Sequence, residues 1–289
     1  MKSKVGLIGL GLMGKPMGLN LIKNGFELCV WNRTKAKAEE LAQAGATIAA
    51  SPREVAAQSD VVITIVSDPP ALEAVLWGQE GVFKGLKSGS VLIDSSTVSP
   101  DIAHRIAGAC AAQGVEFLDA PVTGGTWGAE KGELLFMIGG KEETLERVRP
   151  VLSAMGKRLF LLGPSGAGQT VKLAMNLILA LQVDAFAEAV ALVTSSGVAG
   201  EKLFEVMQSS MARSGVLDVK GPMILKHEYP ASFPLRLMHK DVRLALELAK
   251  KEGISLPAGA AAYQTYTSVK ESSTDDPDFA AVARFWEKH

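Results

Sequence analysis

Short runs of β-branched residues alternate with helical patterns along the first half of this sequence, and the alternation then stops. The strand-like runs cover residues 4–8, 27–31, 61–66, 90–94, 116–121, 134–138 and 158–162. The helix-like stretches cover residues 15–24, 35–44, 52–57, 100–113 and 141–155. Alternation at this spacing requires right-handed crossovers, which produce a largely parallel sheet with helices on both faces. The first half therefore predicts a doubly wound α/β domain.

The strand signals end at Gly163-Pro164-Ser165-Gly166, and the remaining chain reads as helices separated by glycine and proline. A chain of 289 residues is long enough to form two cores. We expect an α/β domain over residues 1–164 and an all-helical domain over residues 165–289, joined by a long helix.

The first helix after this boundary is expected over about residues 168–195 and is apolar on nearly every face. Such a helix has to be enclosed by protein, and the roughly hundred residues that follow offer little surface to enclose it. We therefore expect a partner subunit, in a homodimer or a homotetramer. Because Asn176, Gln182, Asp184 and Glu188 interrupt or follow its apolar stretch, we interpret it as a buried helix and not as a membrane span.

Composition excludes several kinds of partner and site. The formal net charge of −1 gives no field that would attract a polyanion, so nucleic acid is not expected. Cys29 and Cys110 lie in apolar segments without a second Cys or His at ligand spacing, which predicts buried thiols and no metal site. Glycines at 9 and 11 interrupt the apolar opening residues well short of a spanning length. We expect a soluble cytoplasmic protein without a signal peptide.

Residues 9–14 contain the pattern G-x-G-x-x-G directly behind a predicted strand and ahead of a predicted helix. Gly9 suits the tight turn, Gly11 lets the backbone approach a pyrophosphate, and Gly14 lets the helix pack closely. The pyrophosphate would lie at the positive N-terminus of that helix. The pattern predicts a dinucleotide-binding loop in a Rossmann-like domain, and the alternative is a purely structural glycine turn. The predicted contact residues are Gly9, Leu10, Gly11, Leu12, Met13 and Gly14.

The end of the second predicted strand indicates which nicotinamide cofactor is preferred. An acidic residue there would accept hydrogen bonds from the adenosine ribose and repel a 2′-phosphate. This sequence instead has Asn32, the Arg33 guanidinium, the Thr34 hydroxyl and the Lys37 ammonium, which suit a phosphate. We therefore predict NADP(H) and not NAD(H). The alternative makes Arg33 a solvated turn residue and Thr34 an ordinary helix cap.

Two further loops follow predicted strands and contain hydroxyl residues. Ligands of doubly wound folds gather at the carboxyl ends of the strands, so Ser67 and Thr97 are candidate contacts toward the nicotinamide end of the cofactor. Each of them is equally compatible with a helix cap.

Thr123, Gly124 and Gly125 follow another predicted strand and combine a hydroxyl with two backbone amides that no side chain covers. Such a turn can surround a carboxylate with N–H donors. Glycine turns are common, so the pattern alone also fits a turn without a ligand.

Lys172 and Asn176 lie four residues apart in the first turns of the long apolar helix and hence on one face. Desolvation there would lower the pKa of the lysine toward neutrality, which makes its ammonium a usable proton donor. Asn176 would bind the substrate or orient the amine. The alternative is a lysine that reaches past the start of the helix to solvent.

Four stretches together resemble the β-hydroxyacid dehydrogenases, a family that includes 3-hydroxyisobutyrate, tartronate semialdehyde and glyoxylate/succinic semialdehyde enzymes. These stretches are residues 9–14, 119–125, 168–176 and 240–241, and they occur in order and with matching spacing over essentially the whole chain. Residues 31–34 and 233–235, followed by Lys240 and Asp241, look most similar to the glyoxylate/succinic semialdehyde reductase branch, which prefers NADPH.

The resemblance implies a role for several residues. It implies that Lys172 is the catalytic lysine and that the substrate is bound by Thr123, Gly124, Gly125 and Asn176. It implies that Thr97 and Lys240 contact the cofactor, and that Phe233 and Asp241 lie at the mouth of the site or near the lysine. At residues 209–214 the sequence departs from that branch, so Arg213 either binds a distal carboxylate or is surface charge.

These observations predict an enzyme that transfers hydride from NADPH to a small aldehyde acid while Lys172 protonates the developing alkoxide. The alternative substrates within the family are those of 3-hydroxyisobutyrate and tartronate semialdehyde dehydrogenases. The imine reductases share the expected architecture but usually have another residue in place of the lysine. A different class is a catalytically silent, dehydrogenase-like oligomerisation module, and such modules tend to lose the lysine.

Overall fold

The computed structural model describes residues 3–287 and divides into two compact units. Unit 1 ends at Lys172 and unit 2 begins at Leu173. The division falls inside the long helix α8 (Ala167–Ser195), and not at the glycine-proline segment that precedes this helix. The first turns of α8 group with unit 1 because their backbone is bonded to the sheet, as described below.

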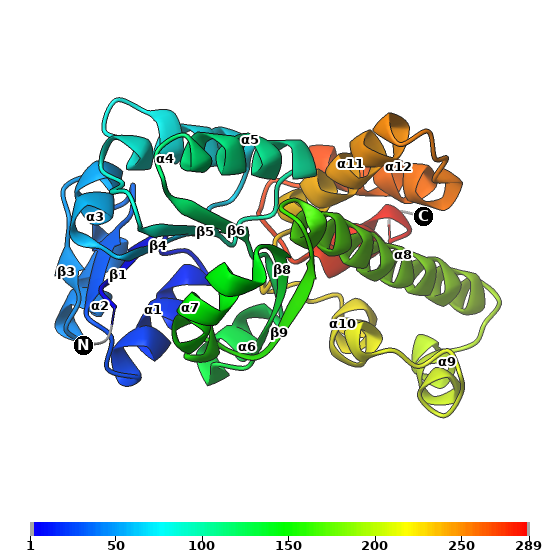
Figure 1. Ribbon diagram of the computed structural model, residues 1–289. Helices are drawn as coiled ribbons and strands as arrows, with labels where there is room; N and C mark the ends of the chain where they lie inside the picture. The colour runs from blue at the N-terminus through cyan, green and yellow to red at the C-terminus, as the bar shows by residue number, and fades with distance from the viewer. Residues whose placement is uncertain (1–2, 288–289) are drawn as a thin grey trace. The chain divides into compact units, whose positions relative to one another are not determined.

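Among the described residues, nine strands of unit 1 form one sheet in the order β3-β2-β1-β4-β5-β6-β8-β7, with β9 also paired to β8 (Figure 1). Neighbours from β3 to β6 are parallel, whereas β8 runs antiparallel to β6 and β7. The strands are β1 (Val5–Ile8), β2 (Leu28–Trp31), β3 (Thr47–Ile48), β4 (Val61–Thr64), β5 (Val91–Asp94), β6 (Glu116–Asp119), β7 (Val122–Thr123), β8 (Leu134–Gly140) and β9 (Gly156–Gly163). The predicted doubly wound, largely parallel sheet is confirmed.

The helices of unit 1 connect these strands. They are α1 (Gly14–Lys23), α2 (Ala36–Gln43), α3 (Pro52–Gln58), α4 (Pro69–Trp77), the short η1 (Val82–Lys84), α5 (Pro100–Ala111), α6 (Gly125–Lys131) and α7 (Glu142–Ser153). Ser51, Asp68 and Ser99 each cap a helix by accepting a backbone N–H, and a proline follows each of them at the first helical position. These caps fix where α3, α4 and α5 begin.

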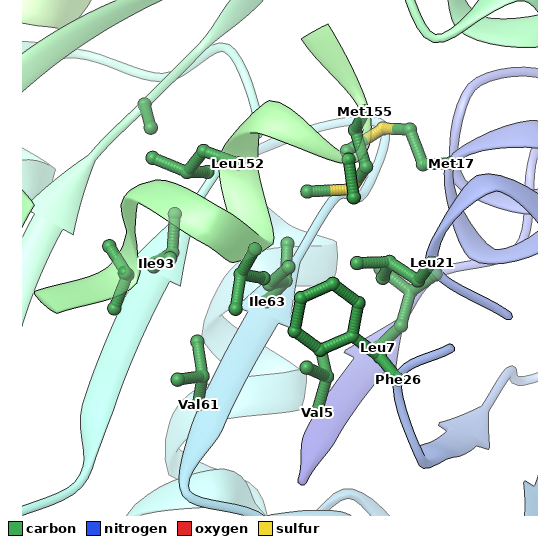
Figure 2. Close-up of a cluster of buried hydrophobic side chains, with 14 of the residues drawn as sticks. Val5, Leu7, Met17, Leu21, Phe26, Val61, Ile63, Ile93, Leu152 and Met155 are labelled. Carbon is green, nitrogen blue, oxygen red and sulfur yellow. The ribbon is translucent and has the colours of Figure 1, made fainter. Parts of the chain in front are cut away.

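The central strands β1, β4 and β5 are buried on both faces, as expected for a parallel sheet between helices. Because side chains alternate along a strand, Leu7 and Ile63 pack into one core, while Ile8 and Val62 pack into the other. Figure 2 shows the first core, in which Met17 and Leu21 of α1 and Leu152 of α7 lie over the strands. This two-sided packing fixes the strands so that the carboxyl ends of β1, β2, β4, β5 and β6 lie along one edge.

Unit 2 is helical, as predicted. Besides most of α8 it contains α9 (Gly200–Gln208), α10 (Gly215–Lys226), α11 (Leu235–Lys251), α12 (Pro257–Ser272) and η2 (Phe279–Phe285). Its core includes the fully buried Tyr266 and Met238, packed with Phe279. One isolated antiparallel bridge joins Pro234 to Asp278.

Helix α8 is only partly enclosed within the single chain. Only 22% of its most apolar 18-residue window is buried, and Ile178 and Leu192 are 54% and 69% exposed. By length and composition it is the one helix of the described residues that is apolar enough to cross a membrane. The expectation that protein encloses this helix is therefore not met within the single chain.

Candidate active site

The glycine-rich loop between β1 and α1 has the geometry that the motif predicts. Gly9 has a φ of +99°, and a Cβ there would lie 2.1 Å from the carbonyl oxygen of Ile65. A Cβ on Gly14 would lie 1.9 Å from the carbonyl oxygen of Gly9. Around Gly11, by contrast, a Cβ would meet nothing within 4 Å. The loop is thus tightly packed at both ends and open at its centre, which fits a pyrophosphate approaching the Gly11 backbone.

Asn32 connects this loop to the end of β2. Its Oδ1 accepts a 2.9 Å hydrogen bond from the backbone N–H of Leu10, and its Nδ2 donates to the carbonyl oxygen of Thr34 at 2.9 Å. The Asn32 amide therefore shapes the nucleotide loop, which the sequence did not indicate. Arg33, Thr34 and Lys37 are exposed beside it, so their cationic and hydroxyl groups are accessible to a phosphate.

The loops after β4 and β5 lie at the same edge and are bonded to each other. The backbone N–H of Val66 donates to the Ser96 hydroxyl at 3.0 Å. The Ser67 hydroxyl donates to Asp68 Oδ2 at 2.6 Å, and Asp68 is the residue that caps α4. Thr97 is half-buried between Ser96 and the buried Val98. Ser67 is therefore not the cap of α4, and both hydroxyl residues flank the carboxyl edge of the sheet.

A fully buried carboxyl group lies beneath the Thr97 loop. Asp94 Oδ1 accepts hydrogen bonds from the Thr64 hydroxyl at 2.7 Å and from the Ser96 backbone N–H at 3.2 Å. Within the described residues no group donates a hydrogen bond to its Oδ2. Burial raises the pKa of Asp94 to about 6.

Asp119, at the end of β6, binds the start of α8. Its Oδ1 accepts from the Gly166 backbone N–H at 2.7 Å, and its Oδ2 accepts from the Gln169 backbone N–H at 3.0 Å. Burial raises the pKa of Asp119, and these backbone N–H groups partly oppose the rise. The carboxylate thereby satisfies helix-terminal N–H groups that α8 itself leaves without partners.

Lys172, the predicted proton donor, follows this anchored turn. It is only 8% exposed, so it is buried and does not reach into solvent. The turn at Thr123 to Gly125 leads from β7 into α6, and Gly124 and Gly125 have φ values of +129° and +62°. Both glycines are exposed. Unit 1 thus contains the nucleotide loop, Thr97, the glycine turn and Lys172.

Three of the predicted site residues in unit 2 form one polar group, held by a hydrogen bond and an ion pair. Asn176 Nδ2 on α8 donates to Asp241 Oδ2 on α11 at 2.6 Å, and both residues are 1% exposed. The Lys240 ammonium lies 3.0 Å from Asp241 Oδ1 in an ion pair, at an angle that does not form a regular hydrogen bond. Helix geometry places Asn176 one turn after Lys172 on the same face of α8.

Phe233 lies in the segment before α11, and this segment is bonded to a buried aspartate. Asp278 Oδ2 accepts from the backbone N–H groups of Ser232 and Phe233 at 3.0 and 2.9 Å. It also forms a 2.8 Å ion pair with Lys220 of α10, whose side chain is 7% exposed. Phe233 packs edge-on against Phe279, with ring centroids 5.6 Å apart. No sequence motif indicated the Lys220–Asp278 pair.

Arg213 lies on the surface in an ion pair. Its Nη2 is 3.1 Å from Asp218 Oδ2, and the arginine side chain is 60% exposed. The hydrogen bond from Arg213 lowers the pKa of Asp218. This pairing favours a surface-charge role for Arg213 over binding of a distal carboxylate of the substrate.

The cavities and thiols do not add a second reactive centre. A cavity of about 670 Å³ is lined by Lys4, Glu27, Ser59 and neighbouring residues at the amino-terminal edge of the sheet, opposite the edge where ligands of this fold bind. Cys29 and Cys110 are buried, and burial raises their pKa values to about 11 and about 12. Within residues 3–287 no group of three metal-ligating side chains is present.

Comparison with known proteins matches both halves of the chain to dehydrogenase families. Residues 4–163 match the NAD-binding domain of 6-phosphogluconate dehydrogenase, and residues 166–286 match the NAD-binding domain of NADP-dependent 3-hydroxyisobutyrate dehydrogenase. The fold and the glycine loop thus define an oxidoreductase with a Rossmann-type NAD(P)-binding domain.

Individual relatives extend over nearly the full length. Glyoxylate/succinic semialdehyde reductase 1 of Arabidopsis thaliana is 37% identical over 96% of both chains. The 2-hydroxy-3-oxopropionate reductase of Escherichia coli is 34% identical over 97% of this chain and 96% of its own. A crystal structure of 3-hydroxyisobutyrate dehydrogenase from Salmonella typhimurium superposes with a TM-score of 0.89 at 29% identity, covering 98% and 99% of the two chains. The chain belongs to the β-hydroxyacid dehydrogenase family, as its motifs predicted.

Proposed function

We propose that this enzyme is an NADP(H)-dependent reductase that converts a small aldehyde acid, of the glyoxylate or succinic semialdehyde type, to the hydroxy acid. The observation that carries the proposal is the burial of Lys172 in the turn of α8 that follows the helix start anchored to Asp119. A lysine held in this way is placed to donate a proton to a bound substrate. The Arabidopsis relative, which has this activity in its name, supports the substrate class.

The residues at the carboxyl edge of the sheet suit the cofactor. The open backbone at Gly11 would receive the pyrophosphate, and Arg33, Thr34 and Lys37 would receive the 2′-phosphate. Ser67 and Thr97 would flank the nicotinamide end, and the resemblance of the Lys240-Asp241 motif makes Lys240 a further candidate cofactor contact. When bound, NADP(H) supplies the hydride. Because no acidic residue stands between Asn32 and Lys37, the phosphorylated cofactor is favoured over NAD(H).

The chain itself supplies the proton and the binding of the carboxylate. The Lys172 ammonium would donate a hydrogen bond to the aldehyde oxygen and then transfer its proton as the alkoxide develops. The exposed amides of Gly124 and Gly125, with the Thr123 hydroxyl, would bind the acid group of the substrate. Asn176 would hold the substrate one helical turn further along α8, and Asp241 fixes the orientation of its amide.

A second candidate is reduction of tartronate semialdehyde or oxidation of 3-hydroxyisobutyrate. The names of the Escherichia coli relative and of the Salmonella structure support these substrates. A non-catalytic oligomerisation module is disfavoured, because such a module has no use for both a buried lysine and an open nucleotide loop.

The function is tested by following nicotinamide absorbance with NADPH and four substrates: glyoxylate, succinic semialdehyde, tartronate semialdehyde and methylmalonate semialdehyde. Butanal serves as the control that has the aldehyde of succinic semialdehyde without its carboxylate. We expect at least about a tenfold higher kcat/KM for succinic semialdehyde than for butanal, since a charge-assisted hydrogen bond contributes roughly 1.5–3 kcal/mol. Equal efficiency with butanal would contradict a carboxylate-binding turn.

We also propose that a second copy of the chain covers α8, in a homodimer or a homotetramer. The exposed Ile178 and Leu192 leave an apolar surface on this helix that water solvates poorly. Asp184 and Glu188 lie within the same helix, and carboxylates are costly in the centre of a bilayer, so a protein partner suits α8 better than lipid. Light scattering after gel filtration should give a mass of two or four chains without detergent, and a monomer would contradict the proposal.

A further inference from the structure

Gln169 is completely buried in the first turn of α8, although this helix begins at the carboxyl edge of the sheet. Its side-chain Oε1 accepts a 3.1 Å hydrogen bond from the backbone N–H of Val98, and its Nε2 donates to the carbonyl oxygen of Ser96 at 2.8 Å. One amide group thus binds the backbone on both sides of Thr97. The side-chain amide of Gln or Asn presents a donor and an acceptor on neighbouring atoms for such a pair of contacts, and Asn is one carbon shorter.

The backbone of the same residue is bonded to Asp119, whose carboxylate also accepts from Gly166. Glycines make room for this carboxylate on two sides. A Cβ on Gly139 would lie 2.4 Å from Asp119 Oδ1, and a Cβ on Gly168 would lie 2.8 Å from Oδ2. The carboxylate therefore occupies a site that is shaped to receive it and leaves little room for it to shift.

These contacts form a continuous chain of bonds inside unit 1, which we call the Asp119–Gln169 clamp. It runs from the end of β6 through Asp119 to the start of α8, and through the Gln169 side chain to the loop after β5. Lys172 lies three residues after Gln169 on α8, so the clamp has the proposed proton donor at one end and Thr97 at the other.

We propose that Asp119 and Gln169 are positioning residues for hydride transfer, which fix Lys172 relative to the Thr97 loop without contacting substrate or cofactor. This inference rests on the proposed function. Its physical basis is that the rate of transfer depends steeply on the placement of the reacting groups, and a displacement of about 1 Å can lower the rate about a hundredfold. The adenosine end of the cofactor is bound by other loops, so cofactor affinity should change little.

The test compares Gln169→Leu and Asp119→Asn with the wild type in the full-length enzyme. Gln169→Leu keeps the approximate size of the side chain and removes both bonds to the Thr97 loop. Asp119→Asn keeps the shape of the carboxylate but replaces one acceptor oxygen by an NH₂ donor. This donor then faces the backbone N–H of either Gly166 or Gln169. Ser59→Ala is the matched control. It removes a buried 2.7 Å hydrogen bond from the Ser59 hydroxyl to the carbonyl oxygen of Val55. Ser59 lies just before β4, at the opposite edge of the sheet.

For both clamp variants we expect kcat per NADPH-binding site to fall by about tenfold to a hundredfold, with the NADPH dissociation constant within about threefold of wild type. The isotope effect with deuterated NADPH should rise, because hydride transfer becomes more rate-limiting. Substitution of a residue that only supports folding would reduce the number of NADPH-binding sites and leave kcat per site and the isotope effect unchanged. This is the result expected for Ser59→Ala. Unchanged kcat per site and unchanged isotope effect in Gln169→Leu would overturn the inference.

Failure of the proposed function is recognised separately, by a wild type that reduces none of the four aldehyde acids. In that case hydrogen exchange tests the clamp itself. Gln169→Leu should lose protection at the Val98 amide, and Asp119→Asn should lose it at the Gln169 amide. Wild-type protection at both amides would overturn the clamp.

Discussion

The Asn176 side-chain amide donates a 2.6 Å hydrogen bond to the Asp241 carboxylate, and through it α8 is joined to α11 in the core of unit 2. The same carboxylate is paired with the Lys240 ammonium at 3.0 Å. All three residues were predicted for the site from sequence motifs, although Asn176 and Asp241 are 65 residues apart in the sequence. Their association shows that two distant motifs contribute to one polar group.

This shared carboxylate predicts unequal and coupled effects of truncation. Asp241→Ala should destabilise the enzyme by about 3–5 kcal/mol, because it removes a buried carboxylate that binds both Asn176 and Lys240. Asn176→Ala should cost about 1–3 kcal/mol, since it leaves the ion pair in place. In urea denaturation the double variant should lose less stability than the two single losses combined. Strict additivity would contradict a direct bond between the two side chains.

The buried carboxyl group of Asp94 predicts a pH-dependent effect. Its pKa is raised from 3.8 to about 6 by burial, so between these pH values the unfolded chain has released a proton that the folded chain retains. The contribution of Asp94 to stability therefore falls as pH rises from about 4 to about 6 and stays constant above. Asp94→Asn should accordingly gain up to about 3 kcal/mol over wild type at pH 8 and almost nothing at pH 4. Urea denaturation at both pH values tests this, and a pH-independent difference would contradict it.

Cofactor preference should depend on the exposed residues after β2. Arg33→Ala should raise the KM for NADPH by about tenfold to a hundredfold, because the guanidinium would form charge-assisted bonds to the 2′-phosphate. The KM for NADH should remain near its wild-type value. Arg147→Ala, which removes an exposed arginine from α7, is the control and should change neither KM. Parallel losses with both cofactors in Arg33→Ala would indicate a general effect on the nucleotide loop and contradict 2′-phosphate recognition.

The sequence predicted most of the fold, because the alternation of strands and helices is strong in unit 1. Two of the missed elements, α6 and β3, carry weak local signals. Helix α6 has glycines at its first position and within it, and β3 is two exposed residues at the edge of the sheet. Helix α4 was missed although Asp68 followed by Pro69 is a helix-start signal. The antiparallel course of β8 depends on pairing with β6, which no local pattern encodes.

For the site, the sequence predicted residues whose chemistry is visible in a short motif, such as Lys172 and the glycine loop. It did not indicate Asn32 as a bridge within the nucleotide site, because the partner of its side chain lies 22 residues away at Leu10. Asp119 and Gln169 stood inside the recognised motifs without an assigned role. Their partners lie 47 to 73 residues away, and only the folded chain reveals which backbone groups they bind.

The proposed chemistry depends most directly on the buried side chain of Lys172. Single-turnover reduction of the best aldehyde acid by NADPH should be slowed by about 10²–10⁴-fold in Lys172→Ala, which is the usual contribution of a placed proton donor. The NADPH dissociation constant should stay within about threefold of wild type, and added methylamine should restore part of the lost rate. A Lys172→Ala enzyme that reduces the aldehyde within tenfold of the wild-type rate would contradict the proposed role of this lysine.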